Sequence, residues 1–200
     1  MSAKFEIAHK NSQQHEGGYV SPEVAASIRD AGGETYRGYA RNAHPNSEVW
    51  KIIDDYKKTH SSMQRYNGVS YFGLKHGSYI LNTRLNQLID AAYKKEYWDA
   101  INLGKLKNQS VANFLYDIHM GSTTGLIAAV KFLQDKLDLL ADGKIGEKTI
   151  AAINKHMNKS LFEELKAFRK KWLERVPDSY EAVLMKRTDS FFFLEEKEPG

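Results

Sequence analysis

The segment HEGGYV, residues 15–20, places a single carboxyl group directly before two glycines and an aromatic ring. Small or apolar residues recur upstream at helical spacing, at Phe5, Ala8 and Ser12. The same spacing reaches Glu16, so the sequence predicts a first helix that carries Glu16 in its last turn. A carboxyl group at the negative end of a helix favours its protonated form, which general acid catalysis requires. From spacing alone, a surface glutamate beside a glycine cap is the simpler interpretation.

A second glycine-rich segment, IRDAGGETYRGYA, follows at residues 28–40. A turn of this composition lets the backbone approach a ligand closely and directs short polar side chains into a cleft. Cleavage of a glycosidic bond needs one protonated acid and a second carboxylate that activates water or attacks. Glu16 and Asp30 are candidates for this pair, with Thr35 holding the water. A hairpin turn with solvated acids is the simpler interpretation of the same spacing.

The composition is that of a globular protein of one domain, or of a domain with a small appendage. The chain has 200 residues, of which 42% are hydrophobic and 27% charged. It has no cysteine, which excludes disulfides and thiolate metal sites. The net charge of +4 is only a mild bias towards polyanions, and we expect no nucleic-acid partner.

Metal and cofactor chemistry has no support in the motifs. The seven histidines show no ligand spacing, and there is neither a phosphate-binding loop nor a nucleophile elbow. DLLADGKIGEKT has some likeness to a calcium loop, but Leu140 and Thr149 occupy two positions where the required oxygen ligands are wrong. We therefore expect no metal site and no cofactor.

The N-terminal sequence lacks the apolar core of a secretion signal. The chain also contains no run of about 18 apolar residues, the length that could span a membrane. We therefore expect synthesis in the cytoplasm without membrane insertion.

Helical periodicity dominates the chain, and the only sheet that the pattern predicts is a short one between Tyr19 and Ala40. Ser110 is the expected cap of one helix, and Ser160 with Glu163 forms the expected capping box of another. The apolar run that begins at Phe191 is expected to pack as an extended segment against the body. The predicted helical faces lie within residues 49–56, 81–98, 110–121, 126–137, 147–153 and 160–172.

HEGGYV followed by DAGGETYRG resembles the signature of glycoside hydrolase family 108, whose members are N-acetylmuramidases that act on peptidoglycan. YKKEYWDA (residues 93–100) and FLYDIHMG (residues 114–121) resemble later helices of the family. Residues 131–153 are similar to the peptidoglycan-binding segment that usually follows the catalytic part. The likeness extends from about residue 4 to about residue 175.

The resemblance implies a mainly α, lysozyme-like fold with a small β-sheet beside the active-site cleft. It matches Glu16 to the catalytic glutamate and assigns Asp30 and Thr35 to the partner positions on the sheet. This chain has a longer connection, SPEVAASIR, between the two motifs, and Gly38-Tyr39 where glycine-isoleucine is more usual. The residues expected to bind substrate are Tyr19, Gly33, Glu34, Tyr36 and Tyr39.

The expected organisation is a catalytic region at residues 1–98, a helical peptidoglycan-binding-like region packed on it at residues 99–180, and a tail at residues 181–200. The expected reaction is hydrolysis of the β-1,4 bond between N-acetylmuramic acid and N-acetylglucosamine. Its partners would be peptidoglycan glycan strands and a holin-like export protein, because the enzyme would act in the periplasm or cell wall after export or lysis. The alternative is a non-catalytic peptidoglycan-binding or secretion-accessory protein on the same scaffold.

Overall fold

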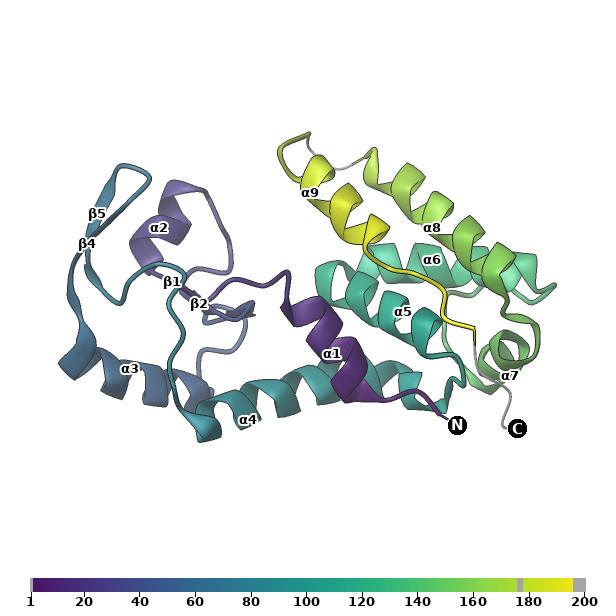
Figure 1. Ribbon diagram of the computed structural model, residues 1–200, viewed down its shortest axis with the longest axis horizontal. Coiled ribbons are helices and arrows are strands. Elements are labelled where there is room, and N and C mark those ends of the chain that lie inside the picture. Colours follow the sequence, from purple (N-terminus) through teal and green to yellow (C-terminus); the bar gives the residue numbers. More distant parts are fainter. Residues whose placement is uncertain (1, 176–177, 196–200) are drawn as a thin grey trace. The chain divides into compact units, whose positions relative to one another are not determined.

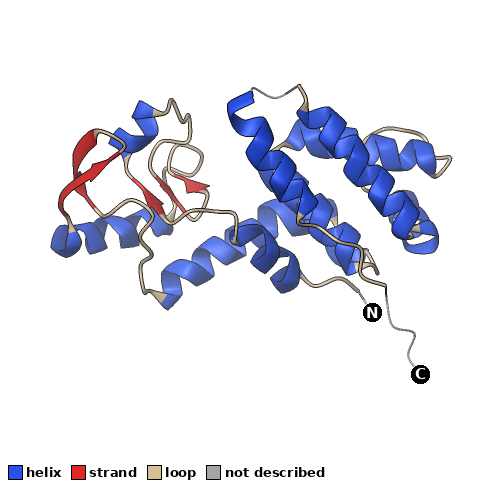
Figure 2. Ribbon diagram, turned by 45° about the horizontal axis from the view of Figure 1, so that its top comes forward, coloured by secondary structure: helices blue, strands red, loops and turns tan. Residues whose placement is uncertain are grey.

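The computed structural model describes residues 2–175 and 178–195, and the chain divides into two compact units. One unit comprises residues 13–92, and the other comprises residues 1–12 together with residues 93–200. The predicted fold class is confirmed, because helices predominate among the described residues and their strands form two small sheets (Figure 1, Figure 2). Residues 176–177 of the predicted middle region and residues 196–200 of the predicted tail lie outside the described residues. The predicted functional boundaries stay a prediction.

The unit of residues 13–92 contains a three-stranded antiparallel sheet of β1 (Tyr19–Val20), β2 (Thr35–Tyr36) and β3 (Tyr39–Ala40), in that order. The sheet lies within the segment that the sequence predicts. The β2–β3 turn consists of Arg37 and Gly38, both with positive φ (53° and 76°). Two-residue hairpins favour such a turn because its twist matches that of the strands.

The register of this sheet sorts its residues into two faces. Tyr36 pairs with both Tyr19 and Tyr39, and residues directly opposite in an antiparallel ladder share a face. The three tyrosines therefore line one face, where all are buried. Thr35 lies on the other face and is partly exposed. The short sheet thus presents an aromatic core on one side and a small polar residue on the other.

A second sheet, which the sequence interpretation did not include, follows α2 (Pro22–Ser27) and α3 (Glu48–His60) in the same unit. β4 (Ser62–Tyr66) and β5 (Val69–Gly73) form an antiparallel hairpin. Its turn is Asn67-Gly68, with φ of 46° and 83°. The expectation of a single sheet is therefore wrong, because Asn-Gly between alternating residues is a strong hairpin signal.

Most of the remaining helices are close to the predicted ones, with different ends, but the helix of Asp178–Asp189 was not predicted from the sequence. Asn108 and Asn158 cap α5 and α8 by accepting hydrogen bonds from the amides of Val111 and Leu161. The expected serine caps are wrong because each helix begins upstream, at an asparagine that caps as well as serine does. The elements are α1 (Phe5–Gln13), α4 (Thr83–Tyr93), η1 (Lys94–Trp98), η2 (Asp99–Ile101), η3 (Leu103–Lys105), α5 (Gln109–Gly121), α6 (Thr123–Lys136), α7 (Glu147–His156), α8 (Lys159–Leu173) and α9 (Asp178–Asp189).

The core of the second unit is built around α5, whose residues from Ser110 to Ile118 are all buried. Phe114 packs against Phe191 with ring centroids 5.2 Å apart, and Phe191 is only 5% exposed. The amide of Leu194 donates to Oγ of Ser110 over 2.8 Å. The prediction that the chain from Phe191 onwards packs as an extended segment is confirmed for the described residues.

Within residues 2–175 and 178–195, none of the helices is both long enough and apolar enough to cross a membrane.

Candidate active site

Glu16 lies in a bend after the first helix. α1 ends at Gln13, and the amide of Glu16 donates to the Gln13 carbonyl over 3.1 Å. The expectation that Glu16 occupies the last helical turn is therefore wrong, because a turn at residues 14–15 separates it from the helix. Glu16 is partly exposed, so its carboxyl group can reach solvent and a ligand.

The second glycine after Glu16, Gly18, permits a close approach of two backbone segments. A Cβ atom on Gly18 would lie 2.4 Å from the carbonyl oxygens of both Gly77 and Ser78. Gly18 thus lets residues 77–78 run beside β1, where the Tyr19 amide donates to Ser78 (2.9 Å) and the Gly77 amide donates to Tyr19 (2.8 Å). Gly17 has open space around its Cα. The second glycine of the motif therefore holds the chain after Glu16 in place.

Tyr79 lies next to Glu16 and was not identified from the sequence. Its hydroxyl donates to the backbone carbonyl of Glu16 over 3.4 Å, and its side chain is 60% exposed. The ring makes an edge contact with the buried Tyr36, at 6.5 Å between centroids. An exposed aromatic side chain therefore reaches the backbone of the candidate acid. Only the fold could identify it, since 63 residues separate the two in the chain.

The side chains of Asp30 and Thr35 lie close to each other beside Gly32. A Cβ atom on Gly32 would lie 3.1 Å from Oδ1 of Asp30 and 3.6 Å from Oγ1 of Thr35. Oδ1 of Asp30 accepts the amide of Gly32 (2.8 Å), and the hydroxyl of Thr35 donates to the carbonyl of Gly33 (3.0 Å). Gly33 has φ of 67° and faces Asn42 so closely that a Cβ would lie 2.8 Å from Nδ2. This glycine therefore fixes the turn that brings Asp30 and Thr35 together.

The three tyrosines expected to bind substrate form part of the core instead of an exposed surface. Tyr19, Tyr36 and Tyr39 are 1%, 0% and 7% exposed. The hydroxyl of Tyr36 accepts the amide of Ile80 (2.9 Å), and the ring of Tyr39 stacks on His44 at 4.2 Å. None of these three rings offers an open face to a sugar. Their buried position instead allows them to stabilise the sheet that carries Thr35.

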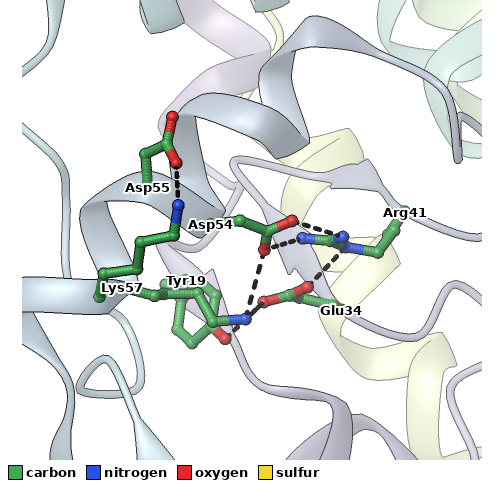
Figure 3. Close-up of polar contacts among 7 residues, drawn as sticks. Tyr19, Glu34, Arg41, Asp54, Asp55 and Lys57 are labelled. Carbon is green, nitrogen blue, oxygen red and sulfur yellow. Dashed lines mark hydrogen bonds and ion pairs between the residues drawn. The ribbon is translucent and has the colours of Figure 1, made fainter.

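Glu34, also expected to bind substrate, is 4% exposed and lies at the centre of a polar network (Figure 3). Its Oε1 accepts hydrogen bonds from the hydroxyl of Tyr19 (2.6 Å) and from Nζ of Lys57 (2.8 Å). Its Oε2 forms an ion pair with Nε of Arg41 at 2.6 Å. Arg41 also donates two hydrogen bonds to Asp54, at 2.6 and 3.1 Å. These contacts join β1 and the turn after β3 to α3.

The electrostatics of the network agree with a structural role. Burial raises the pKa of the Tyr19 hydroxyl, and the hydrogen bond to Glu34 raises it further. The hydrogen bond from Arg41 lowers the pKa of Asp54 against a smaller opposing effect of burial. Burial opposes the charge on Arg41, but its bonds to Asp54 and its proximity to Glu34 raise the pKa of Arg41 overall. Glu34 is thus well suited to hold the site's strands in register.

Within residues 2–175 and 178–195, no group of three or more histidine, aspartate and glutamate side chains is placed to hold a metal ion.

Comparison with known families and structures shows similarity to one family and to solved structures. The family model described as Glycosyl hydrolase 108 matches residues 10–122, which include Glu16, Asp30 and Thr35. The solved structure of Brucella abortus SagA matches with a TM-score of 0.53 and 23% sequence identity, over 94% of each chain. At this identity the structural match shows a shared fold. No curated protein matches the chain in sequence.

Proposed function

The chain belongs to glycosyl hydrolase family 108, and from this we propose that it cleaves the β-1,4 bond between N-acetylmuramic acid and N-acetylglucosamine of peptidoglycan. The observation that carries the proposal is the position of Glu16 in the matched segment. Glu16 is a partly exposed acid whose backbone contacts the exposed Tyr79, and Asp30 is an exposed second carboxyl group in the same unit. A pair of carboxyl groups is the usual requirement for glycoside hydrolysis.

In the proposed reaction Glu16 donates its proton to the glycosidic oxygen as the bond from that oxygen to the anomeric carbon breaks. Asp30 stabilises the developing positive charge or accepts a proton from the water that attacks the anomeric carbon. The hydroxyl of Thr35 already donates a hydrogen bond to the Gly33 carbonyl, so its oxygen can accept a hydrogen bond from that water. The reaction uses only protein side chains and water.

We propose that Tyr79 supplies a stacking surface for a sugar ring next to the scissile bond. Its ring is exposed, and its hydroxyl holds the backbone of Glu16. Flat aromatic faces bury much apolar area at small cost in side-chain entropy, which suits the apolar face of a pyranose. Tyr19, Tyr36, Tyr39 and Glu34 support this arrangement from the core, and Gly33 supports it through its turn.

The protein must also reach its substrate. A cell-wall substrate lies outside the compartment of synthesis, so we propose release through a holin-like partner or cell lysis. The likeness of residues 131–153 to a peptidoglycan-binding segment supports a role in wall binding for the helical unit. Binding of the inactive enzyme to purified sacculi, measured by co-sedimentation, tests that role separately from catalysis.

The experiment that tests the function is mass spectrometry of muropeptides released from purified sacculi. Wild-type protein is compared with Glu16→Gln and with a matched control, Glu23→Gln, which alters an exposed acid of α2 in the same unit. We expect fragments with reducing muramic acid ends from wild type and control, and a loss of at least about 100-fold in Glu16→Gln. Equal release by all three would remove Glu16 from the mechanism. Binding without release by the wild type would favour the accessory-protein alternative.

A further inference from the structure

Arg169 of α8 is a buried cation with an unused donor. The residue is 5% exposed, and its guanidinium lies over the ring of Trp172 at 4.6 Å. Its Nη1 atom is buried and has no hydrogen-bond partner among the described residues. Leaving a buried charged donor unpaired is costly, so such an atom points to a missing acceptor.

The unused donor faces the beginning of α6. A Cβ atom on Gly125 would lie 2.5 Å from Nη1 of Arg169, so the guanidinium lies directly over this glycine. Gly125 is in the first turn, where its amide is capped by Oγ of Ser122 (3.0 Å). The amides of Thr123 and Thr124 precede the first intrahelical hydrogen bonds, and both side chains are exposed. The N-terminus of this 14-residue helix carries partial positive charge.

The neighbouring carboxylate is already engaged by a second arginine. Arg187 of α9 donates from Nε to both oxygens of Asp117, at 2.9 and 3.0 Å, and its Nη2 lies 2.7 Å from Oδ1. Burial lowers the pKa of Arg169 to about 10, which Asp117 opposes and Arg187 reinforces. The carboxylate that acts on Arg169 is therefore already bonded to Arg187, and it leaves Nη1 of Arg169 without an acceptor in the described part of the chain.

We propose that the first turn of α6 and Arg169 form a binding site for an oxyanion, such as a phosphate group or a terminal carboxylate. The amides of Thr123 and Thr124 and the Thr124 hydroxyl would donate to it, as helix N-termini do for anions. Gly125 has no side chain between the turn and the guanidinium, so a small rotation of Arg169 brings Nη1 to the anion. All these residues belong to the helical unit, and none of them takes part in the proposed glycosidase site.

The test measures anion binding by the full-length protein. Inorganic phosphate is titrated at constant ionic strength and followed by NMR and by thermal unfolding. Thr123→Pro removes one amide donor at the first helical position, where proline is tolerated. Its matched control, Thr123→Ala, keeps the amide. Arg169→Met removes the charge, and its own stability in chloride shows that it folds.

We expect saturable shifts at residues 123–126, binding weakened about tenfold by Thr123→Pro, and stabilisation by phosphate that Arg169→Met lacks. Comparing variants in the same salt separates site binding from the general stabilising effect of phosphate. A peptide with a free C-terminal carboxylate, against the same peptide amidated, distinguishes the two sources of oxyanion. Absence of saturable binding of both probes, or binding that Thr123→Pro and Arg169→Met leave unchanged, would overturn the proposal.

Discussion

The hydroxyl of Tyr19 donates a 2.6 Å hydrogen bond to Oε1 of Glu34, which joins the tyrosine of HEGGYV to the glutamate of DAGGETYRG. Two segments that look like separate signatures in the sequence therefore form one structural unit. The buried carboxylate needs partners, and it draws them from β1, α3 and the turn after β3. This network holds in place the short sheet on which Thr35 lies.

Replacing Glu34 should destabilise the protein. Glu34→Gln leaves Arg41 and Lys57 facing a neutral group, and we expect the free energy of unfolding to fall by about 2–3 kcal/mol. The value lies at the low end for a buried ion pair because both cations keep Asp54 as a partner. Denaturant unfolding measures it, with the surface ion-pair variant Glu48→Gln as a control expected to lose less than about 1 kcal/mol. Equal losses in the two variants would argue against the network.

The two glycines after Glu16 should differ in tolerance. Gly18→Ala places a Cβ against two carbonyl oxygens, so we expect a loss of about 2 kcal/mol or more in the free energy of unfolding. Gly17→Ala meets nothing within 4 Å and should change stability by less than about 0.5 kcal/mol. The two variants are compared by thermal unfolding. If Gly18→Ala unfolded like wild type, the close approach of residues 77–78 would be refuted.

Removal of the Tyr79 ring should weaken substrate use more than removal of its hydroxyl. We expect Tyr79→Ala to lower kcat/KM on soluble glycan fragments about tenfold, mainly through KM, because a stacking surface is lost. Tyr79→Phe keeps the ring and should stay within about threefold of wild type. An unchanged KM in Tyr79→Ala would exclude the ring as a sugar contact.

Two adjacent phenylalanines near the C-terminus offer a test of the packing of the end segment. Phe191→Ala opens a cavity against Phe114 and should cost about 3–4 kcal/mol of unfolding free energy. Phe192 is 69% exposed, so Phe192→Ala should cost less than about 1 kcal/mol. Equal effects in denaturant unfolding would show that the segment is not anchored by Phe191.

Acidification should reduce stability through His119. Burial lowers the pKa of His119 below its ordinary value of 6.5, against a smaller opposing effect of its contact with the Tyr97 carbonyl. The neutral form is therefore favoured in the folded state, and its stabilisation is complete above pH 6.5 and is lost as the pH falls through the lower, folded-state pKa. His119→Gln should show a weaker dependence of unfolding free energy between pH 8 and pH 5. An identical dependence in variant and wild type would contradict this origin.

The features that depend on local periodicity could be predicted from the sequence. The helical segments and the sheet between Tyr19 and Ala40 follow from spacing and turn residues that lie within a few positions of each other. The Asn67-Gly68 hairpin was equally local and could have been predicted from its turn signal. The serine caps failed because asparagines two positions upstream cap equally well.

The candidate site was less predictable because its parts meet through the fold. The role of Gly18 depends on Gly77 and Ser78, about 60 residues away in the chain, and the proximity of Tyr79 to Glu16 arises in the same way. Aromatic residues near a motif do not reveal which face they occupy. Only the strand register shows that Tyr19, Tyr36 and Tyr39 share the buried face.

The division of the chain into units has a consequence for its synthesis. Residues 13–92 are contiguous and form one unit, whereas the other unit combines residues 1–12 with the chain from residue 93 onwards. The amide of Ala3 donates to the Leu106 carbonyl (2.7 Å), and Phe191 completes the packing around α5. On the ribosome the inserted unit can therefore fold first, as domains generally do in order of emergence. The first residues of the helical unit must wait until Phe191 has left the exit tunnel before the packing around α5 is complete.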